Sequence, residues 1–174
     1  MGENTVSPLN AASELRISKE EMYMLMAVVL SARSTCKRIG SDGLIKRVGC
    51  VITTKDLTNI LSVGYNGNAA GLPDECSNPG VPGNCGCLHA EENAISKCHT
   101  PHRNKVMFTT DSPCERCAKL TINSGFDTVY YLREYRDTTG LKLLHSVGVV
   151  TNQLSIKYNA VLASILNTTL PKQQ

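Results

Sequence analysis

The sequence predicts a single α/β domain in which a mixed β-sheet lies between helices. Its 174 residues suit one ordinary domain that can bury a substantial core. The predicted helices and strands alternate along the chain, which contains no repeat, low-complexity tract or linker that would divide it. Hydrophobic residues make up 41% and charged residues 19%, which excludes a disordered or collagen-like chain.

The first half of the chain is predicted to form one helix followed by a β-hairpin. Ser18 and Glu21 have the spacing of a capping box, and apolar residues at helical intervals extend the helix to residue 34. The Met-rich stripe of this helix is interpreted as core packing. Two β-rich stretches, 47–54 and 58–65, are separated by a short turn and predict the hairpin.

The second half follows a long irregular segment, 66–88, which is rich in Gly, Pro, Asn and Cys. Such a segment in a compact chain usually carries a function or a metal. Pro113 suits the first turn of a helix and Gly125 its end. The elements expected are a helix at 89–98, a strand at 104–110, a helix at 113–124, a strand at 126–132, a short helix at 140–146 and a strand at 147–151. The tail contains one further possible helix at 158–166.

The charge of the chain is mild, with a formal net charge of +3 and a pI of about 8.4. This argues against nucleic acid or a membrane surface as a partner and is compatible with a small anionic substrate. The longest apolar run, 22–30, is nine residues, far short of the ~20 that span a bilayer. The first 17 residues carry no apolar signal core. We therefore expect a soluble, cytosolic protein.

The chain contains eight cysteines, for which disulfides and metal binding are the competing explanations. A reducing compartment favours metal. Cys50 lies in the middle of a predicted strand and is expected to be a buried free thiol. Cys98, His99 and His102 follow a predicted helix and are interpreted as its polar end. His145 is expected to be a surface or partly buried residue of a late helix.

Two short patterns define a candidate metal site, each at the predicted start of a helix: His89-Ala90-Glu91 and Pro113-Cys114-Glu115-Arg116-Cys117. Cys114 and Cys117 lie one helical turn apart, where the helix dipole favours thiolates. With His89 as third ligand, a tetrahedral zinc ion keeps one position open for water, as in catalytic sites. Glu91 can then accept a proton from that water without binding the metal.

The order H-x-E followed by P-C-x-x-C is the signature of zinc nucleobase deaminases, and the chain resembles the deoxycytidylate (dCMP) deaminases of bacteria and phages. The resemblance spans about residues 20–151. The stretches that carry it are 31–36, 64–67, 89–95 and 113–118, with 129–131 and Tyr135. It implies a cytidine-deaminase-like three-layer fold with a central mixed five-stranded sheet and helices on both faces. The deaminase-type catalytic domain would be 18–151, between an N-terminal arm (1–17) and a C-terminal extension (152–174).

The resemblance implies hydrolytic deamination of dCMP to dUMP and ammonia. His89, Cys114 and Cys117 would bind the catalytic Zn²⁺. Glu91 would protonate N3 of cytosine while water attacks C4. Asn66 would hydrogen-bond the sugar.

Further contacts are implied for the rest of the nucleotide. Tyr131 or Tyr135 would line the base and phosphate pocket, and the sequence does not choose between them. Arg33, Lys37 and Arg38 are candidates for the phosphate, against the alternative of a solvated basic helix end. The segment Gly64-Tyr65-Asn66-Gly67 is tied in the family to an allosteric nucleotide site, with dCTP (and Mg²⁺) as activator and dTTP as inhibitor.

The remaining cysteines suggest a second, structural zinc. Many phage and bacterial members of the family bind one, and Cys36, Cys76, Cys85 and Cys87 would be its ligands here. The sequence Cys85-Gly86-Cys87 departs from related chains, which leaves open whether both cysteines bind.

Other functions remain as alternatives. The same chemistry serves deaminases of cytidine, 5-substituted dCMP and tRNA adenosine, although an enzyme acting on RNA would need a stronger basic footprint. A zinc-stabilised binding module without catalysis would not need Glu91. The family is commonly hexameric, so a homo-oligomer is expected.

Overall fold

The computed structural model describes residues 16–40, 43–81, 84–101, 103–158 and 161. In this part of the chain helices and strands alternate as the sequence predicts. The elements are α2 (Lys19–Ser31), β1 (Gly49–Thr53), β2 (Ile60–Tyr65), α3 (Ala90–Ser96), β3 (Lys105–Asp111), α4 (Glu115–Asn123), β4 (Phe126–Arg133), α5 (Thr139–Ser146) and β5 (Val150–Gln153).

The five strands form one mixed sheet in the order β2-β1-β3-β4-β5. The strand β1 pairs antiparallel with both β2 and β3, whereas β3, β4 and β5 run parallel. The C-terminal ends of β2, β3 and β4 therefore lie at the same edge of the sheet. The register shows this directly, since Gly49 pairs with Tyr65 and Asp111 with Arg133. The segments that follow these strand ends build the candidate site.

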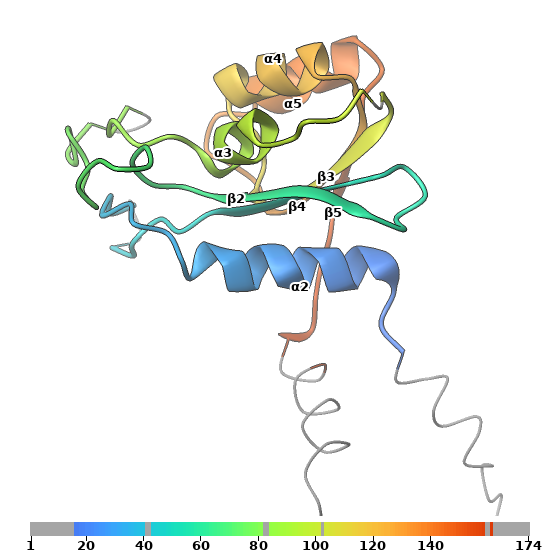
Figure 1. Ribbon diagram of the computed structural model, residues 1–174, viewed down its shortest axis with the longest axis horizontal. Coiled ribbons are helices and arrows are strands. Elements are labelled where there is room, and N and C mark those ends of the chain that lie inside the picture. The colour runs from blue at the N-terminus through green and yellow to red at the C-terminus, as the bar shows by residue number, and fades with distance from the viewer. Residues whose placement is uncertain (1–15, 41–42, 82–83, 102, 159–160, 162–174) are drawn as a thin grey trace, which may run out of the picture.

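Helices cover both faces of the sheet (Figure 1): α2 lies on one face, and α3, α4 and α5 lie on the other. Neighbouring residues of β1 serve the two cores, because Val51 belongs to the cluster beneath α2 and Ile52 to the cluster beneath α3 to α5. All of β1 is buried, as expected of a strand covered on both faces. The three-layer fold with a mixed five-stranded sheet is confirmed.

The helix α2 begins with the predicted capping box. Ser18 Oγ accepts a hydrogen bond from the Glu21 N–H at 3.1 Å, and Glu21 Oε2 accepts one from the Ser18 N–H at 2.9 Å. The helix packs closely on β1 because residue 49 is glycine: a Cβ there would lie 1.9 Å from the Ala27 carbonyl oxygen. Met24 is fully buried whereas Met22 is exposed, so the Met-rich stripe contributes only partly to the core.

Two predicted boundaries differ from the structure by three residues, more than any of the others. The first helix ends at Ser31 and not at residue 34, because the chain continues in turns whose N–H groups bond three residues back. The last strand is Val150–Gln153 and not 147–151. There Gly148 adopts a left-handed φ of 81°, and the amides of 147–149 bond back to carbonyls of α5, which ends the helix before the strand can start.

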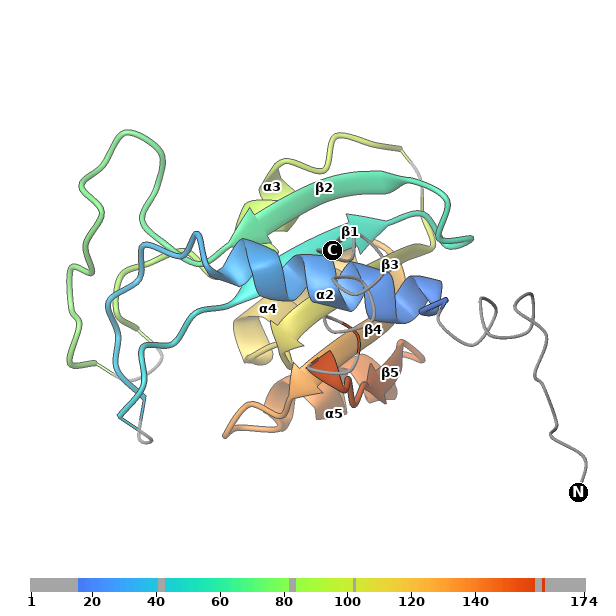
Figure 2. The same ribbon diagram turned by 90° about the horizontal axis from the view of Figure 1, so that it is seen from below.

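The N-terminal arm up to residue 15 and most of the possible tail helix lie outside the described residues. Over the described ranges, no helix has both the length and the apolar character needed to cross a bilayer. Figures 1 and 2 both show the loop that follows β2 projecting from one end of the sheet, beside the segment that links α2 to β1.

Candidate active site

The starts of α3 and α4 bring three metal-ligand side chains together. His89 is the N-cap of α3, Cys114 is the N-cap of α4, and Cys117 lies in the first turn of α4. His89 Nδ1 lies 3.5 Å from Cys114 Sγ and 3.4 Å from Cys117 Sγ. The three ligand atoms all lie within 4.8 Å of one another. This nitrogen and sulfur donor set fits Zn²⁺ with one coordination position left open.

The backbone around Cys114 is held by close packing against α5. A Cβ at Gly140 would lie 2.0 Å from the Pro113 carbonyl oxygen and 2.9 Å from Cys114 backbone atoms. Only glycine allows this approach, so the beginning of α5 fixes the turn that presents the first cysteine.

The three side chains shift one another's pKa values because they lie in mutual contact. Hydrogen bonding from Cys117, helped by His89, lowers the pKa of Cys114 to about 4 against the effect of burial. The hydrogen bond to Cys114, with negative neighbours, raises the pKa of His89 to about 9. The hydrogen bond with Cys114 and burial raise the pKa of Cys117. A divalent ion would displace the protons held by His89 and Cys117.

Glu91 lies in the first turn of α3 and is 4% exposed. Glu91 lines a small cavity, the inner cavity, together with Asn66, His89, Cys114 and Tyr135. Burial raises the pKa of Glu91 to about 7, although nearby His89 acts in the opposite direction. A carboxyl group with this pKa can both accept and donate a proton near neutral pH.

Asn66 lines the inner cavity, and its amide already has backbone partners. Asn66 Oδ1 accepts from the Val48 N–H at 2.8 Å, and Asn66 Nδ2 donates to the Lys46 carbonyl at 2.8 Å. The amide keeps one further N–H and one oxygen lone pair for a ligand. Its position is therefore fixed before any ligand binds.

The rest of the Gly64–Gly67 segment is shaped by packing. A Cβ at Gly64 would lie 2.3 Å from the Ala90 carbonyl oxygen, and one at Gly67 would lie 2.3 Å from Thr35 Oγ1. Gly64 thus allows the end of β2 to pack against α3, and Gly67 allows the chain after β2 to run against the segment after α2.

An outer cavity of about 770 Å³ opens beside the inner one. The two share Arg38, Asp111 and Tyr135 in their walls. The outer wall is rich in basic side chains, namely Lys37, Arg38, Lys46, Arg133 and Arg136. Arg133 Nε forms an ion pair with Asp111 at 2.5 Å, so part of this positive charge is already compensated.

The structure distinguishes between the residues that the sequence left as alternatives for contacting the nucleotide. Arg33 is exposed at the end of α2, and neither it nor Tyr131, which is buried on β4, lines either cavity. Five further polar residues that line one or both cavities were not predicted from the sequence, namely Lys46, Asp111, Ser112, Arg133 and Arg136. Asp111 and Arg133 could have been found as the polar residues that end two neighbouring parallel strands.

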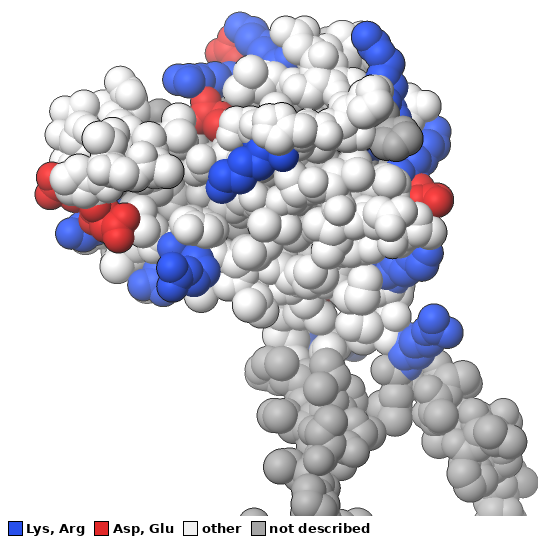
Figure 3. All heavy atoms as spheres, viewed as in Figure 1, with Lys and Arg blue, Asp and Glu red and all other residues white. Residues whose placement is uncertain are grey.

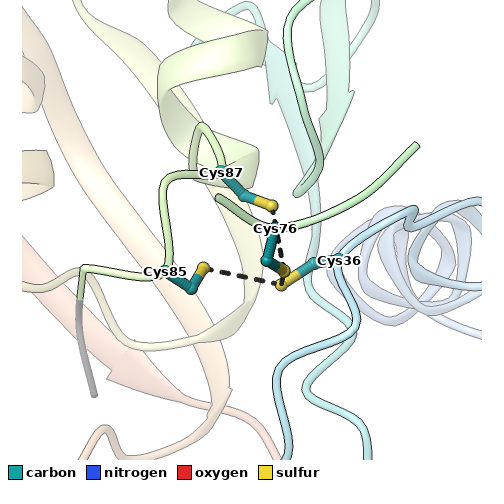
Figure 4. A group of neighbouring side chains, drawn as sticks. All are labelled: Cys36, Cys76, Cys85 and Cys87. Carbon is teal, nitrogen blue, oxygen red and sulfur yellow. Dashed lines mark hydrogen bonds between the residues drawn. The ribbon is translucent and has the colours of Figure 1, made fainter. Parts of the chain in front are cut away.

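The four remaining candidate cysteines form a second group (Figure 4). Cys36 Sγ lies 3.6 Å from Cys76 Sγ and 3.7 Å from Cys85 Sγ, and Cys76 Sγ lies 3.4 Å from Cys87 Sγ. All four sulfurs lie within 4.8 Å of one another. Both cysteines of the Cys85-Gly86-Cys87 turn therefore belong to the group, which the left-handed φ of 88° at Gly86 permits.

The environment of this cysteine group differs from one sulfur to the next. Burial raises the pKa of Cys36 to about 11. Burial also acts to raise the pKa of Cys76, but the Lys37 N–H and the neighbouring thiols outweigh it and lower that pKa. The Lys37 N–H donates to Cys76 Sγ at 3.2 Å.

Three other predictions concern side chains away from both groups. Cys50 is fully buried in the core as a free thiol, as predicted. Cys98 is half-buried and His99 exposed after α3, whereas His102 lies outside the described residues. His145 is exposed, and its Nε2 lies 2.5 Å from Thr151 Oγ1.

The fold and the histidine–cysteine site together define a class of protein. Comparison with known protein families identifies that class. The model of the cytidine and deoxycytidylate deaminase zinc-binding region matches residues 17–133. The chain belongs to this family, as the resemblance predicted, and Zn²⁺ is the metal that its donor set fits.

Two individual proteins are similar to most of this chain. The chain is 30% identical over 154 residues to deoxycytidylate deaminase of Saccharomyces cerevisiae, covering 81% of this chain and 46% of the yeast protein. It is 31% identical over 149 residues to ComE operon protein 2 of Bacillus subtilis, covering 81% and 74%. The chain thus spans about half the length of the yeast enzyme.

A solved structure supports the same fold. The dCMP deaminase of cyanophage S-TIM5, in complex with dCMP and dUMP, superposes with a TM-score of 0.64 at 28% identity. The superposition covers 86% of this chain and 99% of the phage chain. This confirms the predicted cytidine-deaminase-like fold.

Proposed function

We propose that the protein catalyses the zinc-dependent hydrolytic deamination of dCMP to dUMP and ammonia. One observation carries the proposal: two members of the His89, Cys114 and Cys117 donor group, His89 and Cys114, line the same inner cavity as the buried carboxyl of Glu91. A structural metal site does not need such an acid. The similarity to a phage enzyme whose structure holds dCMP and dUMP supports this substrate and product.

The proposed chemistry divides between the metal and the chain. Zn²⁺ held by His89, Cys114 and Cys117 would supply Lewis-acid activation of water, lowering its pKa from 15.7 to about 7. Glu91 would take the proton of that water on its carboxylate and deliver it to N3 of cytosine. The water oxygen would bond to C4, and Glu91, a carboxylate again after protonating N3, would move the remaining hydroxyl proton to the exocyclic nitrogen. The bond between C4 and that nitrogen would then break, so that ammonia leaves and C4 keeps the oxygen as the carbonyl of dUMP.

We further propose that the outer cavity holds the 5′-phosphate. Arg38 supports this assignment because it is half-buried and borders both cavities. A guanidinium can bind two phosphate oxygens at once, and Lys46 lies in the same wall. Tyr135 would lie between base and phosphate, and Asn66 would meet the sugar with its remaining polar capacity.

We propose a second, structural zinc at Cys36, Cys76, Cys85 and Cys87. The mutual approach of the four sulfurs supports it, since four thiolates make a closed tetrahedral site. Such a site would connect the segment after α2 to the middle and to the C-terminal end of the loop after β2. We also propose that the protein works in the cytoplasm, because none of its eight cysteines forms a disulfide, as is usual in a reducing compartment.

A polynucleotide substrate is less well supported than a free nucleotide. On the face shown in Figure 3, the lysine and arginine side chains of the described residues lie in separate groups and not in one continuous stripe. The net charge of +3 points the same way.

We propose two further properties on the family resemblance. One is regulation by dCTP with Mg²⁺ and by dTTP. The other is assembly into a homo-oligomer, for which the hexamer is the expected form. Exposed apolar side chains on α2, Met22 and Val29, support self-association, because such side chains are often covered by partners. Light scattering checks the assembly, and a monomer at micromolar concentration would contradict it.

The deciding experiment measures ammonia release by the zinc-loaded protein from dCMP, 5-substituted dCMP, deoxycytidine and cytidine. Each substrate is assayed alone, with dCTP and Mg²⁺, and with dTTP. We expect dCMP to be turned over with the highest kcat/KM. Absence of turnover with every substrate would favour a zinc-stabilised binding module, and a preference for a nucleoside would overturn the phosphate assignment.

A further inference from the structure

Glu92 connects the two helix starts that carry the catalytic metal ligands. It follows Glu91 in the first turn of α3, with a side chain that is only 10% exposed. Glu92 Oε2 accepts a hydrogen bond from the backbone N–H of His89 at 2.8 Å. Glu92 Oε1 lies 2.6 Å from Arg116 Nε in an ion pair. One carboxylate thus touches the backbone of the histidine ligand and a side chain of α4.

Arg116 lies between the two cysteine ligands, Cys114 and Cys117, in the sequence of α4. Its pairing with Glu92 therefore ties the cysteine-bearing helix to the histidine-bearing helix. Over the described part of the chain Glu92 Oε1 has no hydrogen-bond partner, so the ion pair with Arg116 is the contact that offsets its charge. A buried carboxylate that loses such a partner is strongly unfavourable.

A second ion pair on α4 provides a natural comparison. Lys119 and Glu115 form an i, i+4 pair at 2.7 Å, and both side chains are more than half exposed. Exposed pairs of this kind contribute little, and this one lies within a single helix. It has the same charge types as the Glu92–Arg116 pair but does not connect α4 to α3.

We propose that Glu92 and Arg116 are positioning residues for the catalytic zinc. They hold His89 at the distance from Cys114 and Cys117 that the metal requires, and so set how long the ion stays bound. Neither residue lines the inner cavity, so neither is a catalytic residue. Groups that orient metal ligands typically change metal affinity by about 10–100-fold when removed.

The test measures zinc transfer from the full-length holoprotein to a chromophoric chelator. The variants are Glu92→Gln, Arg116→Gln, the double variant, and Lys119→Gln as matched control. The Cys114→Ser protein identifies which kinetic phase belongs to this site and which to the four-cysteine group. The unfolding temperature of each zinc-free protein and kcat at saturating zinc are measured alongside.

We expect Glu92→Gln and Arg116→Gln each to release the catalytic zinc about tenfold faster or more, with kcat at saturating zinc close to that of the parent. The double variant should be no worse than the poorer single variant, because the two residues act as one unit. Lys119→Gln should behave as the parent. Release rates in both single variants equal to the control would overturn the proposal, whether or not the protein deaminates dCMP.

The design also separates positioning from general stability. If zinc-free Glu92→Gln fails to fold, Arg116→Gln decides the question, since the Arg116 side chain is 75% exposed and its loss leaves no cavity in the core. Equal acceleration of the four-cysteine phase would show a global effect and would contradict the assignment.

Discussion

The backbone N–H of Tyr135 donates a hydrogen bond to Ser112 Oγ at 2.8 Å. This bond joins the chain after β4 to the chain after β3, two strands that run parallel and end at the same edge. Ser112 is buried, and both residues line the inner cavity. The aromatic wall of the site therefore depends on a polar contact between two strand ends.

Loss of the Tyr135 side chain should weaken nucleotide binding. We expect Tyr135→Ala to raise KM for dCMP by about tenfold, equivalent to about 1.4 kcal/mol, and Ser112→Ala to raise it by less because the ring remains. Steady-state kinetics checks this. Tyr131→Phe is the control, since Tyr131 lies outside both cavities, and an equal effect there would contradict the role of Tyr135.

The phosphate assignment predicts a difference between nucleotide and nucleoside. Arg38→Gln should raise KM for dCMP by about tenfold or more, because a hydrogen bond to a charged group is worth about 1.5–3 kcal/mol. The kinetics with deoxycytidine should change little. Arg33→Gln removes the same charge at an exposed position outside the cavities and should leave both substrates unaffected.

The proposed proton carrier can be tested without disturbing the metal. Glu91→Gln should lower kcat by about 10²–10⁴-fold, the usual contribution of general acid–base catalysis. Zinc content should be unchanged, and the unfolding temperature should not fall, because a neutral amide replaces a buried carboxyl group. Turnover that survives this change would rule out the proposed mechanism.

Packing at the start of α5 should be as important for the metal site as the ligands are. Gly140→Ala forces a Cβ against the Pro113 carbonyl, and such overpacking typically costs about 1–3 kcal/mol of the free energy of unfolding. Denaturant unfolding and metal analysis check it. We expect lower stability together with a lower content of the catalytic zinc, whereas Gly148→Asn, at a left-handed position with open space around it, should retain the metal.

The four-cysteine group predicts a metal count. Metal analysis of the pure protein should give about two zinc ions per chain, and Cys36→Ser should give about one. Cys98→Ser removes a half-buried thiol outside the group and should keep both ions. A parent protein with a single zinc would end the proposal of a second site.

Local signals in the sequence were sufficient for most of the fold. The Ser18 and Glu21 capping box, the hairpin of β1 and β2, and the glycine after α4 each depend on residues close in sequence. The last strand was misplaced because the turn at Gly148, in which the amides of 147–149 bond back to α5, occupies the residues where the strand was predicted to begin.

The site was predictable where its residues share a motif and not where they meet only in space. His89, Glu91, Cys114 and Cys117 come from two short patterns. Arg38 could not be separated from Arg33 by sequence, because the choice depends on how the segment after α2 folds back toward the strand ends. The link between Glu92 and Arg116 likewise arises from the packing of α3 against α4.

The walls of the inner cavity include Cys36, Cys85 and Cys87, so the four-cysteine group is also part of the wall of the proposed active site. Enlarging the inner cavity for a bulkier base would weaken the four-cysteine group, and changing that group would alter the shape of the cavity. Substrate range and loop integrity must therefore be changed together in any redesign of this protein.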